Sequence, residues 1–251
     1  MTTRLKTTLD PNLYTQIGLD SGSLTMLGTI VHQLGEAGEY RGAVHLGPDV
    51  KAVFSITADP KSPVAQVTVD LAALDQAQST PPTSGGGDCG CSGSKGGATG
   101  KTYTVNPRGY VLFHVSGGSG GYYVHMRRID APEKDKGYET RTMKSGDVFS
   151  AMILRPGTYS VRNALTKTAA EVVVKYPPPP GDKPYVPGPP VRIDCTADGF
   201  EPKGRVELGA GQGMAFTARA DSRIEIKLEK PDDGPPNPNR GRTGFQKLQP
   251  V

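Results

Sequence analysis

Alternating apolar and polar residues dominate the chain from residue 40 onward. In the run from Val64 to Leu71, Val67 and Val69 share one face with Leu71, and polar residues occupy the other face. This spacing is typical of a half-buried β-strand. Turns rich in glycine and proline separate one such run from the next. The pattern therefore predicts an all-β, or β-dominated, chain.

One early stretch departs from this alternation. Leu24, Leu27, Ile30, Val31 and Leu34 recur at the spacing of an apolar helix face. The same stretch contains a central glycine and three consecutive β-branched residues, which favour a strand. We therefore expect either a helix or a strand at residues 23–34, and the spacing alone favours the helix.

Shifts in composition divide the chain into two to three small β-sandwich modules, Ig-like or cupredoxin-like, joined by linkers. Glycine-rich and proline-rich tracts cannot bury apolar surface and predict tethers or extended spacers. The expected segments are an N-terminal mostly β module (1–79), a Gly/Ser/Cys linker (80–100), a central β-sandwich module (101–176), a Pro-rich spacer (177–190), a small β module (191–231) and an irregular tail (232–251).

The small third module has too few large apolar residues to stand alone. Its nine candidates, at roughly 1.5–3 kcal/mol each when fully buried, fall short of the entropy lost by about 40 residues at about 1.5 kcal/mol each. We therefore predict that residues 191–231 pack against another module or another chain.

Composition and charge narrow the classes of function. The 251 residues include 33 Gly, 23 Pro and no Trp, so several thin cores are expected rather than one large core. The net charge of +4 is spread along the sequence, and a nucleic-acid partner is not favoured. No apolar run reaches the roughly 18 residues of a membrane span. The N-terminus shows no signal-peptide pattern, so we expect a cytoplasmic protein or a particle assembled in the cytoplasm.

Residues 96–102 end like a phosphate-binding loop. That motif needs a glycine five residues before Gly100, where this chain has Lys95. It also needs a strand before it and a helix after it, whereas a strand-like run follows here. Nucleotide binding is therefore not expected.

Cys89 and Cys91 are the candidate ligands of a soft metal. Two thiols on a flexible loop could bind such a metal or form a redox pair. A closed tetrahedral site needs four ligands, and the remaining thiol, Cys195, lies beyond the proline-rich spacer. Incidental or chain-linking cysteines are the alternative. We predict no other cofactor and no catalytic residue.

A short segment from Gly199 to Phe216 resembles cupredoxins in its Gly-Phe-x-Pro opening and its Ala-Gly-Gln turn. The resemblance covers about 20 residues of turn and strand. A blue-copper site needs two histidines and a cysteine, and residues 191–251 contain no histidine. The resemblance therefore implies at most a shared fold. A separate copper-type set would need His114 and His125 to meet Cys195.

The most direct functional interpretation is a non-enzymatic structural or interaction subunit of a larger assembly, such as a particle, a filament or a multi-subunit complex. Thin modules with open strand edges need partners, either copies of this chain or other proteins. One alternative is a metal- or redox-dependent accessory protein that uses the loop of Cys89 and Cys91. A third is a ligand-binding β module, for example for carbohydrate, although the absence of Trp counts against it.

Overall fold

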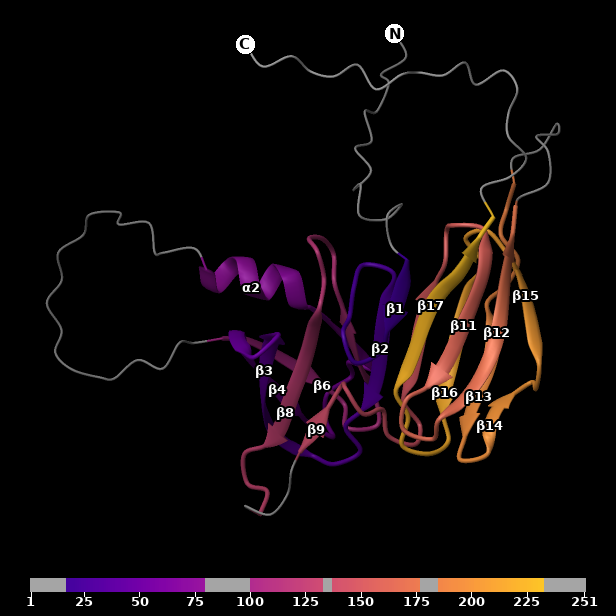
Figure 1. Cartoon of the computed structure of the whole chain (residues 1–251). Helices are drawn as coiled ribbons and strands as arrows, with labels where there is room; N and C mark the ends of the chain where they lie inside the picture. Colours follow the sequence, from indigo (N-terminus) through magenta and orange to yellow (C-terminus); the bar gives the residue numbers. More distant parts are fainter. Residues whose placement is uncertain (1–16, 80–99, 133–136, 177–184, 233–251) are drawn as a thin grey trace, which may run out of the picture.

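Strands account for most of the described residues. The computed structural model of the protein describes residues 17–79, 100–132, 137–176 and 185–232 (Figure 1). Within these ranges the chain forms 17 strands and one short helix, so the expected β-dominated fold is confirmed. In the same ranges, no helix has the length and apolar character needed to cross a membrane.

The elements follow the chain in this order: β1 (Gly18–Asp20), β2 (Gly28–Gln33), β3 (Gly38–Leu46), β4 (Asp49–Ala58), β5 (Gln66–Asp70), α2 (Leu71–Ser79), β6 (Lys101–Val105), β7 (Tyr110–His114), β8 (Tyr122–Arg128), β9 (Tyr138–Glu139), β10 (Val148–Met152), β11 (Gly157–Asn163), β12 (Thr168–Lys175), β13 (Val191–Thr196), β14 (Gly199–Glu201), β15 (Arg205–Gly209), β16 (Gly213–Ala218) and β17 (Ile224–Pro231).

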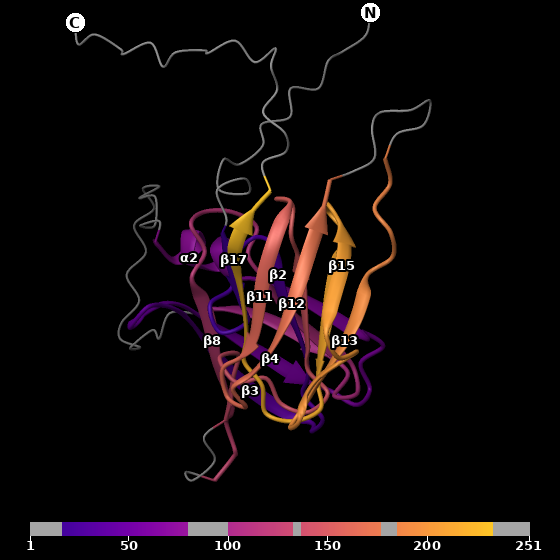
Figure 2. The same ribbon diagram turned by 45° about the vertical axis from the view of Figure 1, so that its right-hand side comes forward.

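These strands form three sheets. Sheet A has the order β1-β17-β11-β12-β15, sheet B the order β6-β4-β3-β8-β9, and sheet C the order β14-β13-β16-β10-β2-β7-β5. Sheet B and α2 lie on one side of the molecule and sheet A lies on the other (Figures 1 and 2). Sheet C contains strands from both sides and connects them.

The predicted helix at residues 23–34 is wrong. The stretch contains β2, which pairs on one side with β7 and on the other with β10. Ile30 is fully buried between its partly exposed neighbours, as expected of a β-branched residue in a central strand. The helix of the described chain instead follows β5. The Asp70 side chain caps it by accepting a hydrogen bond from the Ala73 amide (3.3 Å).

The pairing scheme of residues 28–128, the first half, is repeated in residues 148–231, the second half. In the first half β3 pairs with β4 and β8, and β4 pairs in parallel with β6. In the second half β11 pairs with β12 and β17, and β12 pairs in parallel with β15. In sheet C, β7 lies between antiparallel β2 and parallel β5, as β16 lies between β10 and β13. The fold is therefore an internal structural duplication.

Local geometry confirms the correspondence between the halves. Gly38 and Gly157, which begin β3 and β11, both have positive φ values, 143° and 153°. Two residues later, Tyr40 and Tyr159 each donate a hydrogen bond from the hydroxyl to the carbonyl oxygen four residues earlier, at 3.0 and 2.8 Å. The shift that relates Tyr40 to Tyr159, 119 residues, therefore aligns the start of one half with the start of the other.

The two halves meet where β2 pairs with β10. In this antiparallel pair Ile30 lies opposite Phe149, and the same shift of 119 residues relates these two positions. Both side chains are fully buried. An approximate twofold axis therefore passes between Ile30 and Phe149, and the two halves share sheet C.

Each half also receives a strand from the segment that leads into the other half. β1 leads into the first half but pairs with β17 of the second, whereas β9 leads into the second half but pairs with β8 of the first. A buried hydroxyl at an equivalent position stabilises each of these two strand exchanges through a hydrogen bond. Ser21 Oγ accepts from the Ile224 amide and Thr140 Oγ1 accepts from the Val124 amide, each at 2.9 Å. Separating the halves would expose both sites.

This arrangement bears on the predicted modules. Strands of segment 1–79 pair with strands of segment 101–176, as β2 does with β7, and strands of segment 191–231 pair with both, as β16 does with β10 and β17 with β1. The three segments therefore share sheets. The prediction that 191–231 packs against another part of the chain is confirmed. Linker 80–99, spacer residues 177–184 and tail 233–251 lie outside the described residues.

The core shows how the halves differ in detail. Gly42 of β3 pairs with Phe54 of β4, and the phenyl ring covers the glycine so closely that a Cβ there would lie 2.1 Å from Cζ. At the corresponding pair of the second half, Val161 faces Ala170. In the first half the large side chain of this pair, Phe54, is on β4. In the second half the larger side chain, Val161, is on β11.

Candidate functional site

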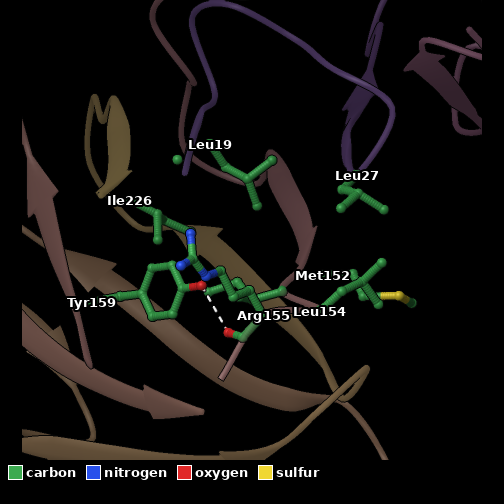
Figure 3. A pocket seen from close by; sticks show the side chains of 9 residues that line it. Leu19, Leu27, Met152, Leu154, Arg155, Tyr159 and Ile226 are labelled. Atoms are coloured by element: carbon green, nitrogen blue, oxygen red, sulfur yellow. Dashed lines mark hydrogen bonds between the residues drawn. The ribbon is translucent and has the colours of Figure 1, made fainter. Parts of the chain in front are cut away.

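Two depressions lie at equivalent positions on either side of the pairing between β2 and β10. The first, which we call the apolar notch, is shown in Figure 3 and is lined by Gly18, Leu19, Leu27, Met152, Ile153, Leu154, Arg155, Tyr159 and Ile226. Its free volume is only about 10 Å³, about the space of one water molecule. Packed side chains therefore fill the notch and leave no room for a ligand.

The second depression, the polar hollow, is open. It has a volume of about 480 Å³ and is lined by His32, Leu34, Glu36, Tyr40, Met126, Arg128, Pro132, Gly137, Tyr138 and Lys144. The shift of 119 residues relates the two depressions position by position. Leu27 and Leu154 at the notch correspond to Gly146 and Gly35 at the hollow. Gly28 and Ala151 correspond to Asp147 and His32, so an acid and a base replace two small residues.

A nearly buried histidine lines the polar hollow and contacts a buried aspartate. His32 Nδ1 lies 2.7 Å from Asp147 Oδ1, and the other carboxylate oxygen accepts a hydrogen bond from the Lys144 amide (2.7 Å). The His32 ring stacks on Tyr138, with centroids 3.6 Å apart. Burial, together with the neighbouring Asp147 charge, raises the pKa of Tyr138 well above its ordinary value. Asp147 and Tyr138 together fix the orientation of the His32 ring. The other half has Ala151 at the position equivalent to His32 and so has no such ring.

The outward face of sheet B carries an unusual pair of cations. Arg41 of β3 and Arg127 of β8 are directly opposite one another in the antiparallel register. Arg41 is exposed, and it makes no ion pair within the described part of the chain. Arg127 uses Nη2 to donate to the carbonyl oxygens of Ala131 and Pro132 (3.3 and 3.0 Å). Its buried Nε has no hydrogen-bond partner among the described residues.

Aromatic rings extend this face beyond the arginine pair. His45 stacks on Tyr123 with centroids 4.7 Å apart, and the Arg141 guanidinium lies 4.4 Å from the centre of the same tyrosine ring. Arg141 also forms an ion pair with Glu139. Burial and the neighbouring His125 lower the pKa of His45. Cations and stacked rings therefore lie side by side on one exposed sheet surface.

The corresponding face of sheet A has a different character. Lys227 of β17 is opposite Ser160 of β11, and the next pair on this face is Arg162 with Glu225. An ion pair joins Arg223, the residue before β17, to Asp20 of β1 (2.6 Å). Further pairs on this face join Lys175 to Glu207 and Arg205 to Glu171. Acidic and basic side chains thus alternate on sheet A, whereas sheet B brings two arginines together.

The structure does not bring the sequence-predicted copper-type set together. His114 lies in β7 of sheet C, His125 in β8 of sheet B, and Cys195 in β13 of the second half. Burial raises the pKa of the Cys195 thiol to about 12. Among the described residues, no group of three or more His, Cys, Asp or Glu side chains is placed to hold a metal ion. The candidate ligands Cys89 and Cys91 lie outside the described residues.

The loop that resembles a phosphate-binding motif continues directly into β6 at Lys101, in agreement with the strand expected there. Sequence analysis did not single out Arg41 with Arg127, or His32 with Asp147. The repeated Gly-x-Tyr at residues 38–40 and 157–159 is a sequence signal of the duplication that relates these sites. No family model, curated protein or solved structure matches this chain.

Proposed function

We propose that this chain is a non-enzymatic interaction subunit of a larger protein assembly, and that the outer face of sheet B contacts an acidic segment of a partner protein. One observation carries the proposal: Arg41 and Arg127 are opposite one another on adjacent strands. Like charges at such positions destabilise a sheet by a few tenths of a kcal/mol to about 1 kcal/mol. A partner carboxylate would remove this repulsion and form charge-assisted hydrogen bonds with both side chains.

The duplication supplies an internal reference for this argument. Sheet A has the same strand order and an equivalent outward face, but that face places Arg162 opposite Glu225. It also pairs Arg223 with Asp20. The same fold is therefore compatible with balanced charge. The unbalanced arginines belong to one face only, which favours a role for that face in binding over a role in folding.

The aromatic residues beside the arginines suit a protein partner. Tyr123 is held between His45 and Arg141, so it presents a fixed ring at low entropic cost. Tyrosine and arginine are enriched where interfaces bind most strongly. We also propose that each half is a small β-sandwich, because Phe54 of sheet B packs 6.2 Å from Phe113 of sheet C. The two halves would then form one rigid support for the face.

A photo-crosslinking amino acid at His125, in the full chain expressed in its natural source, tests the proposal. We expect covalent capture of a protein with an acidic contact segment. The matched control places the same photo-crosslinking residue at Glu225, the position of sheet A equivalent to His125, where no capture is expected. The captured protein is then purified, and its binding to the wild type, Arg127→Glu and Lys227→Glu is measured.

The proposal requires that Arg127→Glu abolish binding, that Lys227→Glu leave it unchanged, and that added salt weaken it. Sedimentation of material purified from the natural source provides a second measurement. A free monomer together with equal capture at both positions would contradict an assembly role for this face.

A further inference from the structure

The arginine pair on sheet B has the geometry of an oxyanion site. Arg41 and Arg127 project from the same face of adjacent strands, where side chains directly opposite have Cβ atoms about 4.5–5.5 Å apart. They border a surface hollow of about 390 Å³ that is lined by Arg41, Ala43, His125, Arg127, Arg128 and Ile129. The small Ala43 next to Arg41 keeps this hollow open. No carboxylate lines it within the described residues.

Arg41 and Arg127 keep donors that make no bond within the described residues, although Arg127 Nη2 already donates to the carbonyl oxygens of Ala131 and Pro132. Arg41 has no ion-pair partner in the described part of the chain, and Arg127 Nε is buried there without a hydrogen-bond acceptor. A buried charged donor without an acceptor is costly. Glu39 and Glu139 lie on the same sheet face, but Glu139 is paired with Arg141, and Glu39 is outside the hollow. Arg128, the third arginine that lines the hollow, is paired with Glu36 and Asp130. The hollow therefore has two guanidinium groups, those of Arg41 and Arg127, that form no ion pair within the described residues.

We infer that the hollow binds a phosphate monoester group between Arg41 and Arg127. The two guanidinium groups together carry a charge of +2. Arg41 offers its whole fork, and Arg127 offers Nη1, because its Nη2 is bonded to two carbonyl oxygens and its Nε is buried. A carboxylate carries one negative charge, whereas a phosphate monoester carries about −1.5 to −2 charges and three acceptor oxygens near neutral pH, which matches the charge of both groups. His125 also lines the hollow.

The inference deepens the proposed function, on which it rests, by naming the chemistry that the partner would present at this point. It is specific to sheet B. The equivalent positions of sheet A are Ser160 and Lys227, and Ser160 is hydrogen-bonded to Glu229 (2.7 Å). In the second half, therefore, only Arg127 has a cationic counterpart, Lys227. The carboxylate of Glu229 already lies beside that position.

Titration calorimetry on the full chain tests the inference at fixed ionic strength. The probes are inorganic phosphate, acetate, a short Gly/Ser peptide with one phosphoserine, and the same peptide without phosphate. We expect phosphate and the phosphopeptide to bind, and Arg41→Gln or Arg127→Gln to weaken each by about tenfold or more. Lys227→Gln is the matched control and should bind as the wild type does. Tighter binding of the phosphopeptide than of phosphate would identify the source as a modified partner.

A second measurement does not depend on affinity. Without ligand, Arg41→Gln should unfold at a higher denaturant concentration than the wild type, because it removes the cross-strand repulsion. At a fixed concentration, phosphate should raise the unfolding midpoint of the wild type by more than that of Arg41→Gln, because the variant binds it about tenfold or more weakly.

Several results would overturn the inference. Equal binding of acetate and phosphate would show that the site does not select a dianion. Equal affinity in the wild type and both arginine variants would place any binding elsewhere. Glu133 and Asp135 follow in the sequence and lie outside the described residues. Phosphate binding confined to a Glu133→Gln/Asp135→Asn variant would show that the chain's own carboxylates occupy the pair. Capture of a partner at His125 without any phosphate binding would refute the phosphate site and leave the proposed function standing.

Discussion

Exchanging bulk between β3 and β4 tests whether the two halves share one packing scheme. The first half places Gly42 under the ring of Phe54, and the second half places Val161 opposite Ala170. Gly42 does not need a glycine for its backbone, because its φ lies outside the left-handed region. The double variant Gly42→Val/Phe54→Ala therefore gives the first half the residue pair that the second half already has.

The magnitudes follow from the contacts. A Cβ on Gly42 would lie 2.1 Å from Phe54 Cζ, so Gly42→Val alone should cost about 1–3 kcal/mol or more through overpacking. Phe54 is 1% exposed, and Phe54→Ala alone should cost about 3–5 kcal/mol. In the alanine background the valine restores three carbon atoms, which recovers about 2 kcal/mol at about 0.8 kcal/mol each. Gly42→Val should therefore destabilise the wild type but stabilise Phe54→Ala.

Equilibrium unfolding in guanidinium chloride measures all four members of this double-mutant cycle. The expected coupling energy between the two positions is about 3–5 kcal/mol. It is the sum of the overpacking cost of Gly42→Val that Phe54→Ala removes and the burial free energy that the valine then gains. Equal slopes of free energy against denaturant would show that the same cooperative unit unfolds in each variant. If Gly42→Val lowers the midpoint by the same amount in both backgrounds, the two halves do not share a packing scheme.

Three further predictions concern single groups. Tyr159→Phe should lower the free energy of unfolding by about 1 kcal/mol, because it removes a 2.8 Å hydrogen bond to a backbone carbonyl; an unchanged midpoint would contradict this. Burial raises the pKa of the Cys195 thiol from 9.0 to about 12, so the folded state keeps its proton longer than the unfolded state, and stability should fall between pH 9 and 12. Cys195→Ala should show a shallower fall in denaturant unfolding over that range, and parallel curves would refute the linkage. If Cys89 and Cys91 bind a soft metal, elemental analysis should find about one equivalent in the wild type and none in the double Cys→Ser variant; no metal in the wild type would remove that alternative.

Local sequence determined the strands but not every element. Alternation predicted runs such as Val67 to Asp70 because each strand places successive side chains on opposite faces, whatever its partners. Leu71, which was expected in the same strand, instead begins α2. It failed at residues 23–34, where helical spacing of apolar residues coincided with β-branched Ile30 and Val31. The outcome there depended on β7 and β10, which bury that stretch from both sides. No local pattern contains that information.

The candidate sites depended almost wholly on tertiary structure. His32 and Asp147 are 115 residues apart in the sequence, and Arg41 and Arg127 meet only because β3 pairs with β8 in one register. A shift of that register by one residue would turn one of the arginines toward the core. By itself, therefore, the sequence determined the β class, the turns and the need of residues 191–231 for a neighbour. The duplication, the strand exchange and the pairing of like charges were decided by long-range strand pairing, because that pairing alone sets which residues face each other.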